Sequence, residues 1–289
     1  MKEYLKLIRV KHWLKNMLVL FPIFFNMNIH KIKYSKVLLI AFFIFCFTSS
    51  IIYIINDIND IEKDKLHPVK KIRPLASGKI SKKNAVITLI TISIINIVLI
   101  SILYKINRSI LIIIIPSVYI IMNILYSKIL KNIPIIDVSI IVAGFILRVI
   151  YGGVVTNVKV SKYLYLMIIF GAYFLAFGKR RNEMIKNGAK SRNSLKLYNK
   201  DFLDKNMYVM LSLAVVSYTL WCVDKETILR IGNDNLYWTI PMVILILEIY
   251  SLNIEKDSNG DPIEVILENK MLLASIFIYF CIMTFMLYF

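Results

Sequence analysis

The hydrophobic positions of this chain gather in long blocks. The clearest are residues 37–55, 84–104, 109–126 and 270–289. As an α-helix, which rises ~1.5 Å per residue, each block is about long enough to cross a hydrocarbon core of roughly 30 Å. The pattern therefore predicts an integral membrane protein with an all-α fold.

Weaker blocks between these four complete the pattern. Together they predict about nine transmembrane helices, over residues 16–29, 37–57, 84–104, 109–127, 135–155, 163–178, 207–223, 237–254 and 271–289. The first is short and contains Pro22. We expect one integral membrane domain over residues 1–289, a polytopic helical bundle.

Two connections are longer than most in this pattern, residues 58–83 and 179–206, and both are strongly basic. We expect their loop-helices to form a cytoplasmic cap over a cavity in the bundle.

The charge distribution predicts an orientation. The chain is 58% hydrophobic and carries a net charge of +18. With the N-terminus inside, the inner segments hold 26 Lys and Arg, the outer segments hold 9, and Arg148 lies within a span. The positive-inside rule then predicts a multi-pass plasma-membrane protein with N-terminus and site cytoplasmic and C-terminus outside. The N-terminal residues lack the apolar core of a signal peptide, so we expect them to remain in the mature protein.

Several functional classes are disfavoured. The three cysteines, Cys46, Cys222 and Cys281, lie in apolar runs without a C-x-x-C spacing, and no two of the three histidines have a metal-ligand spacing. Zinc and disulfide chemistry are therefore not expected. Because the positive charge has a membrane explanation, no nucleic-acid partner is expected either.

A column of acids follows the second expected span. If residues 53–66 continue it as a helix, Asn56, Asp60 and Asp64 lie within about 80° of one another, and Asp57 lies about 20° from Asp64. Such oxygen ligands suit Mg²⁺, or Mn²⁺, held by carboxylates together with substrate phosphates. Acids with this spacing at a membrane boundary favour a metal site over a solvated loop.

A basic turn follows the acids, in the stretch "HPVKKIRP". Pro68 predicts the end of the helix, and Lys70 and Arg73 come next. Cations beside a metal would neutralise a diphosphate. For the bases alone, the positive-inside rule is the stronger explanation.

These residues resemble a known family. The stretch "NDINDIEKDKLHPVKKIRPLASG" (56–78) resembles the first aspartate-rich motif of the UbiA superfamily of intramembrane prenyltransferases. Further blocks resemble its decaprenyl-phosphate phosphoribosyltransferase branch: "RVKHWLKNMLVLFP" (9–22), "YSKILKNIPIIDV" (126–138), "GFILRVIYGG" (144–153), "FGKRRNE" (177–183) and "GDPIEV" (260–265).

The resemblance implies a reaction and a set of site residues. The reaction is Mg²⁺-dependent transfer of 5-phosphoribose from phosphoribosyl diphosphate to a polyprenyl phosphate, with release of diphosphate. The implied metal ligands are Asn56, Asp60 and Asp64, with Asp57 beside them. Groups for the donor's phosphates or ribose are Lys15, Tyr53, Lys70 and Arg73, and groups for the lipid phosphate are Tyr126 and Lys131.

Two further cationic positions stand out. Arg148 lies deep in its span, where an unpaired charge costs several kcal/mol. It is interpreted either as a catalytic phosphate ligand, which we favour, or as part of a buried ion pair. Lys179 and Arg180 stand where the wider superfamily has a second acidic motif, and they indicate recognition of an additional phosphate. Asp261 is expected to cap a turn or the following helix.

Two alternatives remain. One is a UbiA-type prenyltransferase that uses a prenyl diphosphate donor. The other is a lipid or anion transporter, which would place ionisable groups at mid-membrane. Arg148 fits a transporter loosely, but acids at the membrane edge do not. A homo-oligomer is compatible with this sequence.

Overall fold

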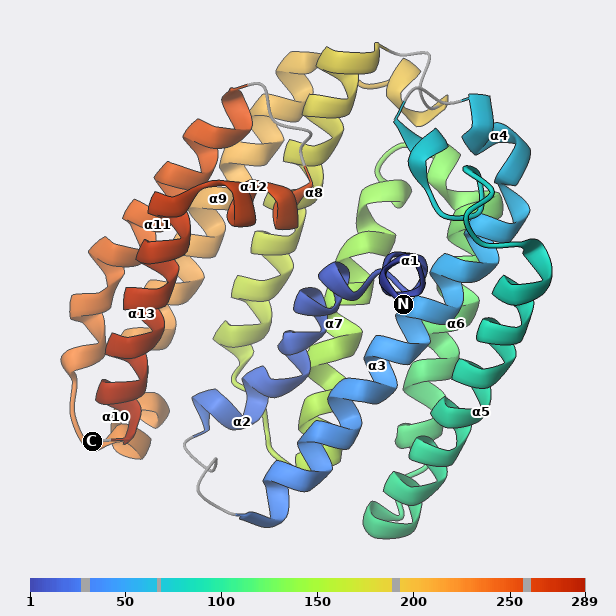
Figure 1. Ribbon diagram of the computed structural model, residues 1–289. Coiled ribbons are helices and arrows are strands. Elements are labelled where there is room, and N and C mark those ends of the chain that lie inside the picture. The colour runs from blue at the N-terminus through green and yellow to red at the C-terminus, as the bar shows by residue number, and fades with distance from the viewer. Residues whose placement is uncertain (27–31, 67–68, 189–192, 257–260, 289) are drawn as a thin grey trace. The chain divides into compact units, whose positions relative to one another are not determined.

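The computed structural model describes residues 1–26, 32–66, 69–188, 193–256 and 261–288, and over these residues every regular element is a helix (Figure 1). The described residues form two compact units. Unit 1 lies within Met1–Ile23, Lys31–Lys128 and Leu147–Val158, and unit 2 within Phe24–His30, Ile129–Ile146 and Lys159–Phe289. The single domain over residues 1–289 stays a prediction.

Eight helices among the described residues are long and apolar enough to cross a membrane. They are Lys36–Asn59, Lys82–Asn107, Leu111–Lys128, Ile136–Thr156, Lys162–Lys186, Lys200–Val223, Asn235–Glu255 and Lys270–Tyr288. They correspond to the second to ninth expected spans, so the predicted all-α membrane fold is confirmed.

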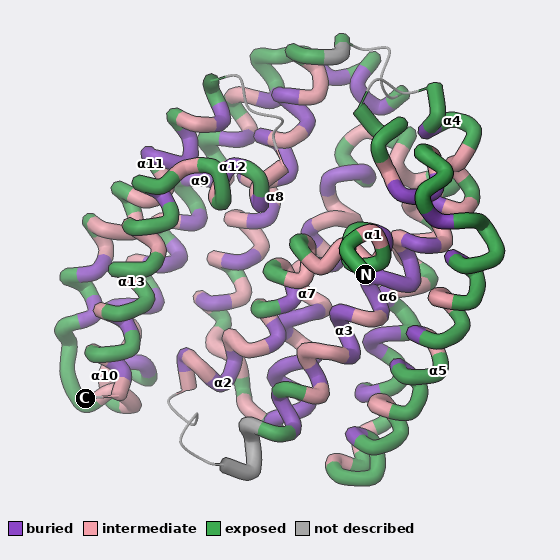
Figure 2. Tube along the Cα trace, viewed as in Figure 1, coloured by how far each residue is buried: buried purple, intermediate pink, exposed green. Residues whose placement is uncertain are grey.

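Unit 1 is built around one central helix, α3 (Ile32–Asn59). It packs against α5 (Lys82–Asn107), α6 (Leu111–Lys128) and the N-terminal α1 (Lys2–Leu7). The tube in Figure 2 is mostly buried along α3 and largely exposed along α5. Because apolar side chains cover the exposed face of α5, this face suits contact with lipid.

The core of unit 1 joins α3 and α6 to the second half of α7 (Ile136–Thr156). Phe45 of α3 packs edge-on against Tyr119 of α6 and Tyr151 of α7, with ring centroids 5.5 and 4.9 Å away. All three rings are buried. Aromatic pairs in this geometry stabilise by ~0.5–1.5 kcal/mol beyond the area that they bury.

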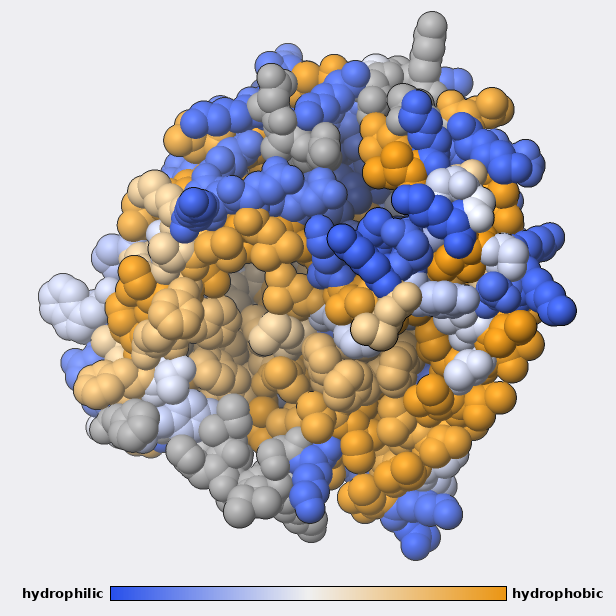
Figure 3. Space-filling view, in the orientation of Figure 1, coloured by the Kyte–Doolittle hydropathy of each residue, from blue (hydrophilic) through white to orange (hydrophobic). Residues whose placement is uncertain are grey.

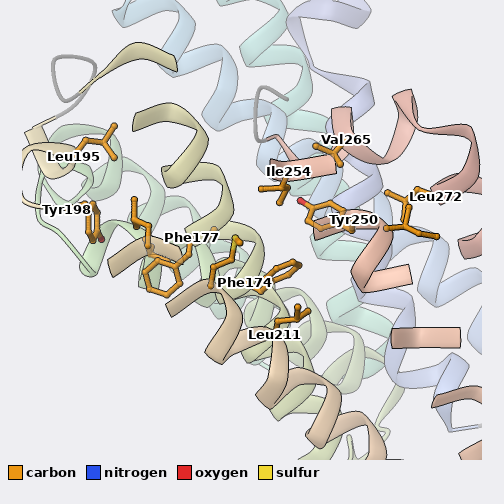
Figure 4. Packing of buried hydrophobic residues seen from close by; sticks show 14 residues of the cluster. Phe174, Phe177, Leu195, Tyr198, Leu211, Tyr250, Ile254, Val265 and Leu272 are labelled. Carbon is orange, nitrogen blue, oxygen red and sulfur yellow. The ribbon is translucent and has the colours of Figure 1, made fainter. Parts of the chain in front are cut away.

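Unit 2 is built on the antiparallel helices α8 (Lys162–Asn187) and α9 (Lys200–Val223), joined by residues that include the short 3-10 helix η5 (Asn193–Lys196). The remaining helices follow in chain order: α10 (Lys225–Ile231), η6 (Asn235–Thr239), α11 (Ile240–Glu255), α12 (Pro262–Glu268) and α13 (Lys270–Tyr288). Figure 4 shows its core, where Phe174 and Phe177 of α8 lie among side chains of the other helices, including Leu211, Tyr250, Ile254 and Leu272.

The first expected span, residues 16–29, is not one α-helix. It begins within a 3-10 helix, η1 (Val10–Leu20), and continues into the short α2 (Phe21–Phe25), while residues 27–29 lie outside the described part of the chain. Pro22 stands in the first turn of α2. A backbone N–H in this turn would have no acceptor within the helix, so proline loses no helical hydrogen bond there.

The 3-10 geometry of η1 explains how it packs. With three residues per turn, Trp13, Asn16 and Val19 fall on one side, and Asn16 and Val19 are fully buried. Trp13 Nε1 donates to Ser50 Oγ at 3.1 Å, and Asn16 Nδ2 donates to Cys46 Sγ at 3.4 Å. The residue number increases along η1, from Trp13 to Asn16, while the number of its partner on α3 decreases, from Ser50 to Cys46. The two helices therefore run antiparallel.

The connection that follows α3 contains two short helices, α4 (Ile61–Leu66) and η2 (Lys70–Ile72). α4 ends just before Pro68, which itself lies outside the described residues. Figure 3 shows hydrophilic residues gathered over α1 and α4 and a hydrophobic surface along α5. This polar end of unit 1 carries the first group of predicted site residues.

Candidate active site

The acid column persists across the break between α3 and α4. Asp60 N–H donates to the Asn56 carbonyl at 3.0 Å, and Asp64 N–H donates to the Asp60 carbonyl at 2.8 Å, so helical spacing continues. Asp57 and Asp64 point toward the same partner, Arg73. Its Nη1 lies 3.2 Å from Asp57 Oδ1 and 2.7 Å from Asp64 Oδ2.

A second arginine, Arg9, completes this group, although no feature of the sequence distinguishes it from the other basic residues near the N-terminus. Arg9 Nη2 donates to Asp57 Oδ1 at 2.6 Å, and its guanidinium lies over the Tyr53 ring at 4.4 Å. Arg9 has φ 54° and ψ 51°, a left-handed conformation that is uncommon for a residue with a side chain. This backbone turn links α1 to η1 and places Arg9 beside α3. We call Arg9, Asp57, Asp64 and Arg73 the arginine–aspartate cluster.

The other members of the column lie apart from the cluster. The Asp60 side chain is 38% exposed, with Lys63 Nζ 3.8 Å from its Oδ1. Asn56 is half-buried. Among the described residues, no three His, Cys, Asp or Glu side chains are arranged to hold a metal ion.

The donor types of the column nevertheless fit a hard divalent cation, since carboxylate and amide oxygens are its preferred ligands. The described arrangement places the Arg73 guanidinium between the carboxylates of Asp57 and Asp64. A cation held by both carboxylates would therefore require this guanidinium to move away.

The other three predicted donor ligands lie in the same unit as the cluster. Lys15 is half-buried on η1, three residues after His12, whose ring lies 5.6 Å from that of Tyr53. Lys70 is exposed on η2. Tyr53, Lys15 and Lys70 all belong to unit 1, so the structure places them in the same unit as the acids.

Arg148 is buried in the core of unit 1. Its Nε donates to Asn16 Oδ1 and its Nη2 to Tyr119 Oη, both at 2.7 Å. The guanidinium also lies 4.8 Å from the centre of the Tyr119 ring. In this arrangement Arg148 fixes η1 against α7 and α6. Its predicted contact with a phosphate stays a prediction.

Gly152, one helical turn after Arg148, lets η1 approach α7 closely. A Cβ atom at this position would lie 2.0 Å from the Val19 carbonyl oxygen and 3.2 Å from Pro22 Cδ. The backbone contact therefore needs a residue without a side chain.

In unit 2, Arg180 belongs to a buried charged cluster. Its Nε donates to Asp137 Oδ2 at 2.6 Å and its Nη1 donates to Glu183 Oε2 at 2.8 Å. Asp137 also accepts from Tyr198 Oη at 2.9 Å and from Ser194 Oγ at 3.3 Å. Through these bonds Ser194 of η5 and Tyr198, just beyond η5, are held to α7, and α7 is held to α8. Recognition of a phosphate by Arg180 stays a prediction.

Tyr198 also stabilises an unusual backbone. Its Oη accepts from Ile135 N–H at 2.5 Å, and Ile135 has φ 67°, which is rare for a β-branched residue. Burial raises the pKa of the Tyr198 phenol, and the neighbouring Asp137 carboxylate raises it further. The hydroxyl therefore keeps its proton and can donate to Asp137.

The remaining predicted residues lie on separate elements. Lys179 Nζ is 3.4 Å from Asp261 Oδ2, and Asp261 caps α12 by accepting from Ile263 N–H at 3.0 Å, which confirms its expected capping role. Tyr126 is half-buried in the last turn of α6, and Lys131 is half-buried on η3 (Leu130–Asn132).

The fold and the site together define a class. This is a polytopic helical membrane protein whose membrane helix ends in carboxylates paired with guanidinium groups, a combination that suits anionic substrates. The chain belongs to the UbiA prenyltransferase family, whose model matches residues 19–276.

Two curated relatives carry one more specific description. The chain is 33% identical over 287 residues to the decaprenyl-phosphate phosphoribosyltransferase of Corynebacterium glutamicum, covering 93% of this chain and 81% of the relative. It is 31% identical over 282 residues to the Mycolicibacterium smegmatis protein of the same name, covering 93% and 87%.

Solved structures agree on the fold. A UbiA homolog from Archaeoglobus fulgidus bound to GPP and Mg²⁺ matches with a TM-score of 0.65 at 18% identity, covering 98% of this chain and 97% of that one. A structure concerning digeranylgeranylglyceryl phosphate synthase in membranes matches with a TM-score of 0.65 at 22% identity, covering 98% of each chain. These likenesses support the helical architecture.

Proposed function

We propose that this protein transfers 5-phosphoribose from phosphoribosyl diphosphate to a polyprenyl phosphate and releases diphosphate. The observation that carries the proposal is the arginine–aspartate cluster, which places two buried carboxylates and two guanidinium groups at the polar end of a membrane helix. The two curated phosphoribosyltransferase relatives supply the identity of the transferred group.

The chemistry asks the protein to stabilise a leaving group. The bond from ribose C1 to the diphosphate oxygen breaks, a bond from C1 to the acceptor phosphate oxygen forms, and the electron pair leaves with the diphosphate. Because the acceptor phosphate is already anionic at neutral pH, no general base is needed. Lys15, Tyr53, Lys70 and Arg73 would bind the donor and hold C1 toward the acceptor.

The acids would hold the metal ion. Asn56, Asp60 and Asp64 would provide its ligands, with Asp57 beside them, and Mg²⁺ when bound would neutralise the departing diphosphate. Mn²⁺ would serve in its place because it accepts the same oxygen ligands. Tyr126, Lys131, Lys179 and Arg180 are proposed for the phosphate groups, and Arg148 for phosphate or for support of η1.

The proposal includes an orientation. The multi-pass chain would lie in the plasma membrane with its N-terminus and the polar end of unit 1 in the cytoplasm and its C-terminus outside. Its partners would be phosphoribosyl diphosphate and a polyprenyl phosphate lipid within the membrane.

The decisive test is donor choice. Purified protein is incubated with a polyprenyl phosphate and either labelled phosphoribosyl diphosphate or a labelled prenyl diphosphate, and the lipid product is identified by mass spectrometry. We expect a phosphoribosyl lipid, loss of product with EDTA, and recovery with Mg²⁺. Product from the prenyl donor alone would establish prenyl transfer instead.

A second test concerns the acid column. Asp60→Asn should lower turnover at least ~100-fold, since it removes a ligand for the charge-neutralising cation. Asp234→Asn makes the same change at an exposed position of unit 2 and should leave turnover unchanged. Full turnover by Asp60→Asn would contradict the proposed metal site.

A further inference from the structure

We propose that Arg9 and Arg73 alternate between two partners. Without donor they are the counter-ions of Asp57 and Asp64; with donor they bind its diphosphate and free the carboxylates for the divalent cation. This rests on the proposed function and adds to it a new donor ligand, Arg9, and an order of binding: the site accepts the cation only together with the anionic donor.

Burial shows which groups can move. The Asp57 and Asp64 side chains are 3% and 5% exposed, whereas those of Arg9 and Arg73 are 20% and 28% exposed. Two buried carboxylates that lose their positive partners would be strongly destabilised. The carboxylates therefore need a cation at all times, and the partly exposed guanidinium groups are the ones able to turn toward solvent.

The geometry makes guanidinium and metal alternatives. One nitrogen, Arg73 Nη1, contacts both Asp57 Oδ1 and Asp64 Oδ2. A divalent cation bound by Asp64, with Asp57 beside it, would repel this guanidinium strongly at such short range. Occupancy by one group therefore excludes the other, unless an anion draws the arginine away.

The surroundings give each arginine a place to go. Arg73 ends η2 in an extended conformation, three residues after the exposed Lys70, on the basic turn proposed to bind phosphates. Arg9 lies over the Tyr53 ring and next to η1, which carries Lys15. Arg9 would keep its contact with the Tyr53 ring as it leaves Asp57, and Arg73 would turn toward an anion bound at the basic turn that carries Lys70.

The exchange predicts a ligand class. The positive charges of the two guanidinium groups must be balanced by another anion when these groups leave the carboxylates. Each guanidinium can bind two phosphate oxygens at once. A monophosphate, with a charge of about −2, could at most balance the two guanidinium groups, whereas a diphosphate has further charge and oxygen atoms for the divalent cation as well. The chemistry therefore favours diphosphate-containing ligands, including the released product.

The experiment measures metal binding in the absence of donor. Purified wild-type protein, Arg73→Gln, Arg9→Gln and the control Lys83→Gln are titrated with Mn²⁺ alone, and bound Mn²⁺ is followed by electron paramagnetic resonance. Removing either arginine should tighten Mn²⁺ binding at least ~10-fold, because a neighbouring positive charge is lost. The same variants should bind phosphoribosyl diphosphate at least ~10-fold more weakly. Lys83 is exposed at the start of α5, so its variant should change neither.

A charge-conserving variant guards against a folding defect. Arg73→Lys keeps a cation near the acids, so its Mn²⁺ affinity without donor should stay close to wild type. Melting temperatures in detergent identify any variant that does not fold. If Arg73→Gln does not fold, the Mn²⁺ affinities of Arg9→Gln and Arg73→Lys test whether the arginines and the cation exclude one another.

The outcomes separate this inference from the proposed function. If both arginine variants bind Mn²⁺ no more tightly than wild type, while wild type still binds the donor, the exchange is refuted and the proposed function stands. If the wild-type protein fails to bind phosphoribosyl diphosphate at any Mn²⁺ concentration, the proposed function itself fails.

Discussion

The contact between Gly152 and η1 gives the sharpest test of the fold. In Gly152→Ala, the added methyl carbon would lie 2.0 Å from the Val19 carbonyl oxygen and 2.9 Å from its carbonyl carbon. Real methyl groups essentially never approach closer than 3.0 Å, so at least about 1 Å of movement is needed. The obstructing atoms belong to the backbone, so a side-chain rotation cannot relieve the clash.

The size of the effect follows from opposing contributions. Overpacking of this kind typically costs about 1–3 kcal/mol. Alanine in a helix is favoured over glycine by up to ~1 kcal/mol, which offsets part of the loss. Moving η1 would also stretch the 2.7 Å bond from Arg148 Nε to Asn16 Oδ1. We expect a net destabilisation of ~1–3 kcal/mol.

Thermal unfolding in detergent measures this effect, with Gly171→Ala as the matched control. Gly171 lies within α8, and a Cβ atom there would meet no atom within 4 Å. The control should therefore melt at or above the wild-type temperature. Because η1 carries Lys15, Gly152→Ala should also lower turnover, by up to ~100-fold for a displacement near 1 Å. Equal melting temperatures for the two variants would refute the close packing of η1 on α7.

Three further predictions concern buried polar groups. Arg148→Met should lower the free energy of unfolding by ~2–4 kcal/mol, and a double-mutant cycle with Asn16→Ala should give a coupling of at least ~0.5 kcal/mol; additive effects would contradict their direct bond. Asp137→Asn should cost ~3–5 kcal/mol because it leaves Arg180 buried without full compensation, whereas Glu62→Gln, at the exposed pair with Lys65, should cost under ~1 kcal/mol; similar melting temperatures would argue against the buried cluster. The pKa of Tyr198 is raised in the folded state. Above pH ~10 the phenol of the unfolded chain loses its proton while the folded protein still keeps it, so Tyr198 lowers the free energy of unfolding as pH rises. Tyr198→Phe should therefore flatten the alkaline loss of stability in a pH series of melting curves, and an unchanged slope would contradict the burial argument.

Hydropathy was sufficient to predict the eight long helices, because each contains a long and predominantly apolar run. The segment over residues 16–29 was misjudged as one α-helix because its first five residues belong to η1, whose packing repeats every three residues, as Trp13, Asn16 and Val19 show. A scan for apolar length does not detect this period, although the period itself is visible in the sequence.

The candidate site was predictable in its residue types and less so in its pairings. The spacing of the acids correctly placed Asp57 and Asp64 near one another, since both contact Arg73. Arg9 was missed because one more arginine near a basic N-terminus looks like part of the positive-inside pattern. Its left-handed backbone, which no side-chain pattern reveals, brings it to Asp57.

Arg148 shows a different limit. An arginine within an apolar span signals a buried polar partner, but nothing local identifies that partner. The bond to Asn16 joins residues 132 positions apart. Similarly, Arg180 and Asp137 lie on different helices, so only their three-dimensional packing reveals the ion pair.

The long separation between η1 and α7 has a consequence for biogenesis. Asn16 and Val19 rest against Arg148 and Gly152, which the ribosome adds more than a hundred residues later. A polar, non-α-helical segment has no stable place among lipid chains by itself. The N-terminal stretch can therefore take its final position only after residues 148–152 have been made, so the part of the chain that is made first is among the later parts to pack.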